Sequence, residues 1–239
     1  MSPAPRTYRY FDLMMTGFVT VLLCANLIGP AKTCALTLPL LGGALVFGAG
    51  NIFFPISYIF GDVLTEVYGY AHARKVIWAG FGAMLFATTM AWLVIHLPVN
   101  PREPYNAIIQ PALETVFGST WRIVCASILA FWAGDFVNSF VLAKMKIWTE
   151  GRLLWTRTIG STLAGQAVDS LIFYPLAFIG TWDSETLWRV VAFNWAFKVG
   201  VEVMMTPVTY GVVGWLKRHE QEDFYDRATN FTPFSLADQ

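Results

Sequence analysis

Six long apolar stretches constrain the fold of this chain more than any other feature. A helix of about 20 apolar residues is long enough to cross the hydrocarbon core of a bilayer. Hydrophobic residues make up 56% of the sequence and charged residues only 13%, far from the composition of an ordinary soluble domain. The sequence therefore predicts an all-α fold, a polytopic membrane bundle with six transmembrane helices. The predicted spans are residues 11–28, 41–61, 75–97, 121–143, 158–180 and 189–215.

The loops between these spans differ in basic charge. Short cytoplasmic loops carry an excess of Lys and Arg. One set of alternate loops, together with the two ends of the chain, holds Arg6, Arg9, Arg74, Lys75, Lys144, Lys146, Arg152, Arg157, Lys217, Arg218 and Arg227. The other set holds Lys32, Arg102, Arg122 and Arg189. We therefore expect both termini to lie in the cytoplasm.

Two segments lie outside the predicted spans. Apolar residues recur at mostly helical spacing in residues 98–120, but Pro111 interrupts the pattern, so an interfacial helix and a surface loop both fit. Residues 1–216 are predicted to form the transmembrane domain. Residues 217–239 are predicted to form a polar cytoplasmic tail, extended or disordered, because they lack a periodic apolar face.

Composition and motifs argue against several classes of function. With 16 basic and 16 acidic residues, the formal net charge is zero and no basic face for nucleic acid is indicated. Cys24, Cys34 and Cys125 are widely separated, which favours neither a disulfide framework nor a thiolate metal site. The sequence has no GxxxxGK[ST] loop for nucleotide hydrolysis and no HExxH zinc motif. We predict no cofactor, no metal site, no catalytic residues and no nucleic-acid partner.

Three of the later spans carry pairs of polar residues. The pairs are Asp135 with Asn138, Gln166 with Asp169, and Lys198 with Glu202. Ionisable side chains inside a membrane are costly and are found mainly where they line a bundle interior, a cavity or a substrate path. Spacings of three and four residues place each pair on one helix face. The pattern predicts a polar cavity of a transporter, although polar side chains that merely hydrogen-bond neighbouring helices together would look similar.

A weak internal repeat links the first two of these pairs to an earlier segment. Gly134–Ser139 aligns with Gly165–Ser170 and more loosely with Gly61–Glu66, and in each a glycine precedes two polar groups on one helix face. The small residue permits close approach of a neighbouring helix or a ligand. Asp62 therefore joins the candidate binding residues.

Three partners are open to Lys198. It could pair with Glu202 on its own helix, or with Asp135 or Asp169 across the bundle. Asp135 or Asp169 could also carry a proton, because a low-dielectric site favours the neutral form of a carboxyl group.

Prolines and aromatic residues single out the second predicted span. Pro55, Pro175 and Pro207 lie inside predicted spans, where a proline removes a backbone donor and bends a helix. Around Pro55, residues Asn51, Phe54 and Tyr58 combine stacking rings with hydrogen-bonding groups. These three are further candidates for substrate binding.

The second span also carries a family resemblance. The run FPISYIFGDVLTEVYGY at residues 54–70, followed by ARKVIW at 73–78, resembles the signature of the queuosine precursor transporter family, part of the vitamin uptake transporter group. The segments Gly134–Ser139 and Gly165–Ser170 are also similar to that family, so the resemblance covers nearly the whole chain. It implies uptake of 7-cyano-7-deazaguanine and 7-aminomethyl-7-deazaguanine across the bacterial inner membrane.

The candidate residues suit such a ligand. A deazaguanine presents N–H donors on one edge, O6 as an acceptor and a flat aromatic face. Asp135 or Asp169 could accept from the donor edge. Candidates for donation to O6 are Asn138, Gln166, Asn51 and Lys198, and candidates for stacking are Phe53, Phe54, Tyr58 and Trp132.

Two other functions remain open at this point. The chain could be the substrate-binding membrane subunit of an ATP-driven vitamin-type importer, because such binders have a similar size and layout. More remotely, Asp135 and Asp169 could form the acid/base dyad of an intramembrane hydrolase. The lipid bilayer and a small deazapurine are the expected partners, and a homodimer fits so small a bundle.

Overall fold

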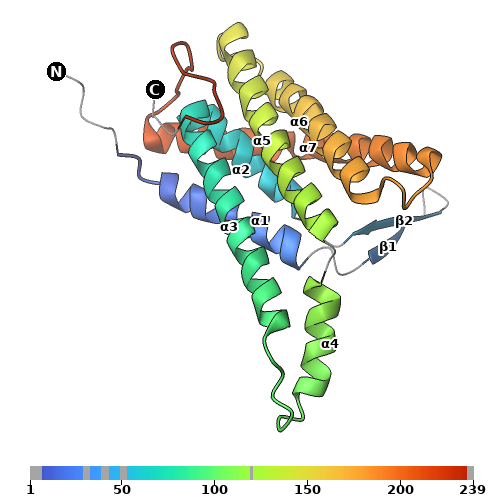
Figure 1. Cartoon of the computed structure of the whole chain (residues 1–239). Coiled ribbons are helices and arrows are strands. Elements are labelled where there is room, and N and C mark those ends of the chain that lie inside the picture. The colour runs from blue at the N-terminus through green and yellow to red at the C-terminus, as the bar shows by residue number, and fades with distance from the viewer. Residues whose placement is uncertain (1–6, 29–32, 39–42, 49–52, 119–120, 236–239) are drawn as a thin grey trace.

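Helices dominate the computed structural model, which describes residues 7–28, 33–38, 43–48, 53–118 and 121–235 (Figure 1). In chain order the elements are α1 (Phe11–Leu27), β1 (Thr33–Leu38), β2 (Gly43–Gly48), α2 (Phe54–Tyr68), α3 (Tyr70–His96), α4 (Asn106–Phe117), α5 (Trp121–Trp148), α6 (Leu154–Phe178) and α7 (Ser184–Glu220). The prediction of a helical bundle is confirmed. The described strands form one antiparallel pair, in which Thr33 faces Gly48 and Leu38 faces Gly43.

Three described helices are long and apolar enough to cross a membrane. They are α3, the part of α5 from Arg122 to Trp148, and α7. Large apolar side chains such as Phe86 on α3 and Met204 on α7 are exposed, as expected of a surface that contacts lipid. Helix α6 is also long, with 25 residues, and α1 is a shorter apolar helix. The structure therefore supports a membrane-helical protein, and the prediction of six spans stays a prediction.

The second predicted span is wrong in its boundaries. Residues 41–61 were expected to be one helix, but Gly43–Gly48 is a strand and α2 begins only at Phe54. Glycines at both ends of that strand disfavour a helix. Pro55 lies in the first turn of α2, where the missing N–H costs nothing, so it starts the helix instead of bending it. Pro175 and Pro207 do lie inside helices, in α6 and α7.

The segment between α3 and α5 contains a helix. Helix α4 continues through Pro111 and lies beside the end of α3 (Figure 1). The side-chain amide of Gln110 donates to the backbone carbonyl of Ile95 at 2.9 Å, which ties the two helices together. Part of residues 98–120 is therefore helical, and a position of this helix at the membrane interface stays a prediction.

Helices α5 and α6 cross at two glycines. A Cβ atom on Gly165 would lie 2.8 Å from Cβ of Asn138 and 2.9 Å from the carbonyl oxygen of Gly134. A Cβ atom on Gly134 would lie 3.0 Å from Cβ of Asp169. Because no side chain separates the two backbones, the polar residues of both repeated segments come together at this crossing.

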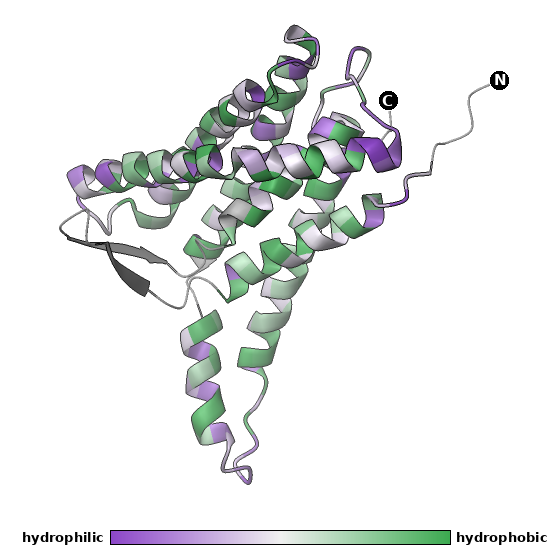
Figure 2. Cartoon of the chain, turned by 180° about the vertical axis from the view of Figure 1, so that it is seen from behind, coloured by the Kyte–Doolittle hydropathy of each residue, from purple (hydrophilic) through white to green (hydrophobic). Residues whose placement is uncertain are grey.

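The segment after α7 folds back over the bundle without forming a helix (Figure 1). Figure 2 shows hydrophilic residues gathered along it and at the end of α7. The carboxylate of Asp226 accepts from the backbone N–H of Tyr70 at 3.0 and 3.1 Å, so it caps the first turn of α3. Arg74 donates to the carbonyl oxygens of Asn230 and Thr232, both at 2.7 Å. Residues 221–235 therefore pack on the helices.

Candidate functional site

A small polar cavity lies where α2, α5 and α6 meet. Its polar lining consists of Ser57, Tyr58, Asp135, Asn138, Ser139 and Gln166. Its apolar lining includes Phe18, Leu64, Ala73, Val76 and Ile77, with Gly61 completing the wall. The volume open to the centre of a water molecule is about 10 Å³, which is room for roughly one water. A purine-sized ligand needs far more room than this cavity offers.

Two residues of α5 that line the cavity, Asn138 and Ser139, form hydrogen bonds with α2. The side-chain amide of Asn138 donates to Oδ1 of Asp62 at 3.0 Å. One residue later, the hydroxyl of Ser139 pairs with that of Thr65 at 3.1 Å. Asp62 and Thr65 are both completely buried. Asn138 thus faces the cavity and also holds a buried carboxylate behind it.

Lys198 on α7 makes an ion pair with Asp169 on α6. Its Nζ lies 2.6 Å from Oδ2 of Asp169. Among the partners that the sequence left open for Lys198, the structure places Asp169, on a different helix, in contact with it. Tyr58 lies near enough to Asp135 and Asp169 to interact with them electrostatically. Asp169 therefore lies beside the cavity and is neutralised by Lys198.

Glu202 is completely buried one helical turn after Lys198. Neither of its carboxylate oxygens has a hydrogen-bond partner among the described residues. Oδ2 of Asp62 and the side-chain oxygen of Gln166 also lack a hydrogen-bond partner among the described residues. Buried polar groups are normally hydrogen-bonded, so these atoms retain unused hydrogen-bonding capacity in the described part of the bundle.

The structure does not bring all candidates to the cavity. The indole of Trp132 packs with Trp78, Phe136 and Phe234, at centroid distances of 5.7, 5.1 and 5.9 Å, and Trp132 does not line the cavity. Asn51 lies outside the described residues, as does the side chain of Phe54. The cavity brings together Tyr58, Asp135, Asn138 and Gln166. Their role in binding stays a prediction.

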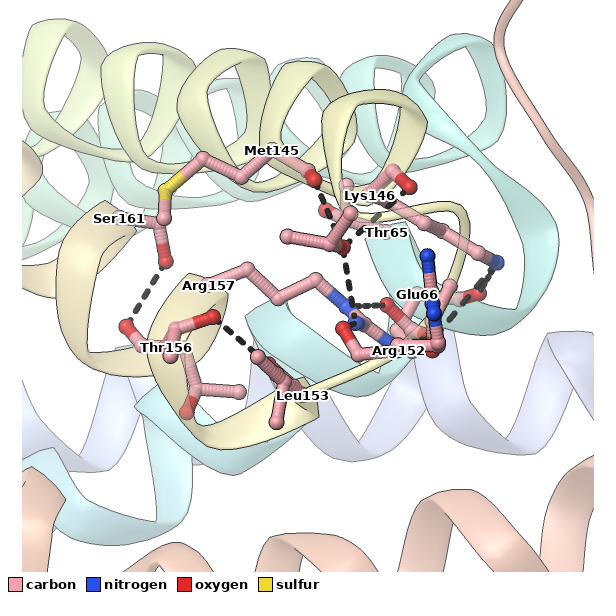
Figure 3. Close-up of polar contacts among 12 residues, drawn as sticks. Thr65, Glu66, Met145, Lys146, Arg152, Leu153, Thr156, Arg157 and Ser161 are labelled. Carbon is pink, nitrogen blue, oxygen red and sulfur yellow. Dashed lines mark hydrogen bonds and ion pairs between the residues drawn. The ribbon is translucent and has the colours of Figure 1, made fainter.

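A buried ion network around Glu66 was missed by the sequence analysis (Figure 3). Glu66 is completely buried, and Arg157 donates to its two oxygens at 2.7 and 2.8 Å. Nζ of Lys217 lies 2.6 Å from Oε1 of Glu66, and Nζ of Lys146 lies 2.6 Å from the Glu66 backbone oxygen. Four helices, α2, α5, α6 and α7, are thus joined through one carboxylate.

The tail completes this network. Oδ1 of Asp223 lies 2.5 Å from Nζ of Lys146 and 2.7 Å from Nζ of Lys217. Burial raises the pKa of Asp223, but the two lysines outweigh burial and hold that pKa below its ordinary value. Sequence reasoning placed Lys146 and Arg157 in a cytoplasmic loop and Lys217 in the cytoplasmic tail. The signal available was Glu66 itself, a carboxylate one turn after Asp62 within an apolar helix.

Comparison with known proteins identifies the family. Residues 48–212 match the family described as "Putative vitamin uptake transporter". The chain belongs to this transporter family. It is 32% identical over 207 residues to the "Probable queuosine precursor transporter" of Bacillus subtilis (strain 168), a match that covers 86% of this chain and 84% of that protein.

Two further relatives carry similar names. The transporter is 24% identical to the "Queuosine precursor transporter" of Escherichia coli (strain K12), over 74% of this chain and 76% of that protein. It is also 24% identical to a "Probable queuosine precursor transporter" of Haemophilus influenzae, over 69% and 67%. No solved structure matches the chain.

Family membership decides between transport and catalysis. The chain is a membrane transporter and not an enzyme. The alternative of a hydrolase with Asp135 and Asp169 as an acid/base dyad is therefore wrong.

Proposed function

We propose that this transporter imports the queuosine precursors 7-cyano-7-deazaguanine and 7-aminomethyl-7-deazaguanine. The names of the three relatives support this substrate class. The observation that carries the proposal is the cavity between α2, α5 and α6, where a carboxylate, two amides and a phenol ring converge. That set of groups matches the donor edge, the O6 acceptor and the aromatic face of a deazaguanine.

Each cavity residue has an expected part in binding. Asp135 accepts from N1–H and the exocyclic amine, because a carboxylate is an acceptor with two oxygens. Asn138 or Gln166 donates to O6, and the ring of Tyr58 stacks on the base. Asp169, Lys198, Glu202 and Asp62 lie around this group and set its charge.

Transport by this route requires alternating access. The closed cavity leaves no space for a base, so helices around it must separate to admit one. The ion network on Glu66 joins four helices on one side of the cavity, and its opening and re-forming would control access from that side. Prolines inside α6 and α7 provide places where those helices can bend.

The basic loops indicate which side this is. Arg74, Lys146, Arg157 and Lys217 all lie at the end of the bundle that holds the Glu66 network and the tail. By the excess of basic residues this end faces the cytoplasm, with both termini, in the bacterial inner membrane. A homodimer fits the small size of the bundle and is tested by the mass of the purified protein in detergent.

Transport by the chain alone tests the proposal. Purified protein in proteoliposomes is expected to take up labelled 7-cyano-7-deazaguanine without ATP or another protein. Uptake that appears only when an ATP-hydrolysing partner is added would instead favour the alternative of a binding subunit of an ATP-driven importer. Absence of uptake of both precursors under either condition would contradict the proposed substrates.

An Asp169→Asn variant tests the site. Loss of the carboxylate removes the partner of Lys198 and leaves a cation without its counter-charge beside the cavity. We expect uptake to fall at least about tenfold, while membrane expression and the size-exclusion profile stay unchanged. Asp12→Asn is the control, because Asp12 is exposed at the start of α1. Normal uptake by Asp169→Asn would remove this residue from the mechanism.

A further inference from the structure

The polar interior of the bundle holds more carboxylates than cations among the described residues. Asp62, Asp135, Asp169 and Glu202 come from four different helices, and of these Asp135 lines the cavity. Lys198 is a cation paired with this group, through Asp169. A carboxylate in a membrane interior is stable when it is paired, hydrogen-bonded or protonated. The remaining carboxylates therefore need another source of positive charge.

Glu202 and Asp62 are the carboxylates that most clearly lack a compensating positive charge among the described residues. Both are completely buried, Glu202 on α7 and Asp62 on α2, and they are close enough to interact electrostatically. Asp62 receives one hydrogen bond, from Asn138 to Oδ1, while its Oδ2 receives none. Both oxygens of Glu202 lack a described partner. Two neighbouring carboxylates out of contact with water do not both ionise, so one proton is shared between them.

The groups around this pair do not supply the missing charge. Glu66 on α2 and Asp135 on α5 act on Asp62, and Tyr58 on α2 is near Glu202. Asp169 and Tyr174 on α6 are near Tyr58, and Lys198 on α7 contacts Asp169. Most of these are acids. Lys198 is engaged with Asp169, and Glu66 is engaged with Arg157 and Lys217.

We propose that Asp62 and Glu202 together form a proton-binding site that couples substrate uptake to the proton gradient. The proposal rests on the proposed function. The link between proton and substrate is Asn138, whose amide now donates to Asp62 and whose side chain also lines the cavity. When a ligand oxygen takes that donor, Oδ1 of Asp62 loses its hydrogen bond. The Asp62–Glu202 pair, which already shares one proton, then takes up a second proton that replaces the lost stabilisation, so substrate and proton bind together.

Proton movement in the wild-type protein is the first test. Proteoliposomes containing a pH-sensitive dye receive 7-cyano-7-deazaguanine without an imposed gradient. We expect the lumen to become more acidic as the base enters, and an outside-acid gradient to raise accumulation at least tenfold over the level with a protonophore. Uptake that moves no protons, or that follows a sodium gradient instead, would overturn the coupling site and leave the proposed function standing. Absence of uptake under every condition would instead refute the proposed function itself.

Variants then locate the site. Glu202→Gln and Asp62→Asn keep the size of each side chain but remove its ability to bind a proton reversibly. In each, the ratio of accumulation with and without the proton gradient is expected to fall to about one. Glu185→Gln on the same helix is the control, because Glu185 is exposed and paired with Arg189. A gradient ratio like that of the control in both variants would place proton coupling elsewhere.

Discussion

Replacing Glu66 by alanine removes the acceptor at the centre of the buried ion network. Three bonds are lost, two from Arg157 at 2.7 and 2.8 Å and one from Lys217 at 2.6 Å. The side chain of Arg157 is only 1% exposed, so its charge remains buried without a carboxylate. Removing one partner of a buried ion pair costs about 3–5 kcal/mol. For a chain of this size, that corresponds to a fall in melting temperature of roughly 6–20 °C.

The matched control is Glu150→Ala. Glu150 also pairs with an arginine, Arg152, at 3.3 Å, but the two side chains are 72% and 79% exposed. Such a surface pair contributes about 0–1 kcal/mol. Thermal unfolding of both variants in detergent, followed by the loss of the monodisperse size-exclusion peak, measures the difference. If Glu66→Ala melts within about 2 °C of Glu150→Ala, the network does not hold the helices together as argued.

Two further predictions concern the helix crossing and the tail. Gly165→Val forces a side chain against Asn138 and Gly134, so we expect it to destabilise the protein by about 1–3 kcal/mol and to abolish uptake. Gly82→Val is the control, because its side chain meets open space and is expected to leave stability and uptake unchanged. Equal melting temperatures of the two variants would contradict the close crossing of α5 and α6. In the folded protein the pKa of Asp223 is held below its ordinary value of 3.8. The stabilisation that its charge contributes is therefore complete above this ordinary value and is lost as the pH falls through the lowered pKa. Acidification from about pH 5 to pH 3 is therefore expected to lower the melting temperature of wild type more than that of Asp223→Asn, and parallel curves would refute the contribution of Asp223.

The long helices could be predicted because membrane insertion leaves few choices. An apolar run of about 20 residues must satisfy its backbone hydrogen bonds internally, which makes it a helix wherever it lies in lipid. The predicted spans 75–97 and 121–143 accordingly agree with α3 and α5 to within about five residues at each end. The span at 41–61 failed because apolar composition was weighed above its glycines and above the position of Pro55.

The polar residues of the cavity could also be found from their spacing. Asn138 follows Asp135 at i+3, and both line the same cavity in the structure. What spacing cannot give is the partner on another helix. The Lys198 to Asp169 pair depends on which helices are neighbours, and 28 intervening residues carry no local signal of that.

The tail was beyond prediction for a related reason. Its carboxylates act on backbone groups of distant helices: Asp226 caps α3, and Glu220 at the end of α7 accepts from the backbone N–H groups of Arg9 and Tyr10 at 3.0 and 2.6 Å. Backbone donors have no signature in a sequence. A polar segment without periodicity therefore looks the same whether it is solvated or serves as a cap.

Equilibrium binding to the purified protein tests the central claim most directly. We predict that 7-cyano-7-deazaguanine and 7-aminomethyl-7-deazaguanine bind in a one-to-one ratio and more tightly than guanine. Replacing Asp135 or Gln166 by alanine is expected to weaken binding at least about tenfold, because each variant loses one buried hydrogen bond to a charged or amide group. Binding of neither precursor, or unchanged affinity in both variants, would contradict the assignment of the cavity between α2, α5 and α6 as the substrate site.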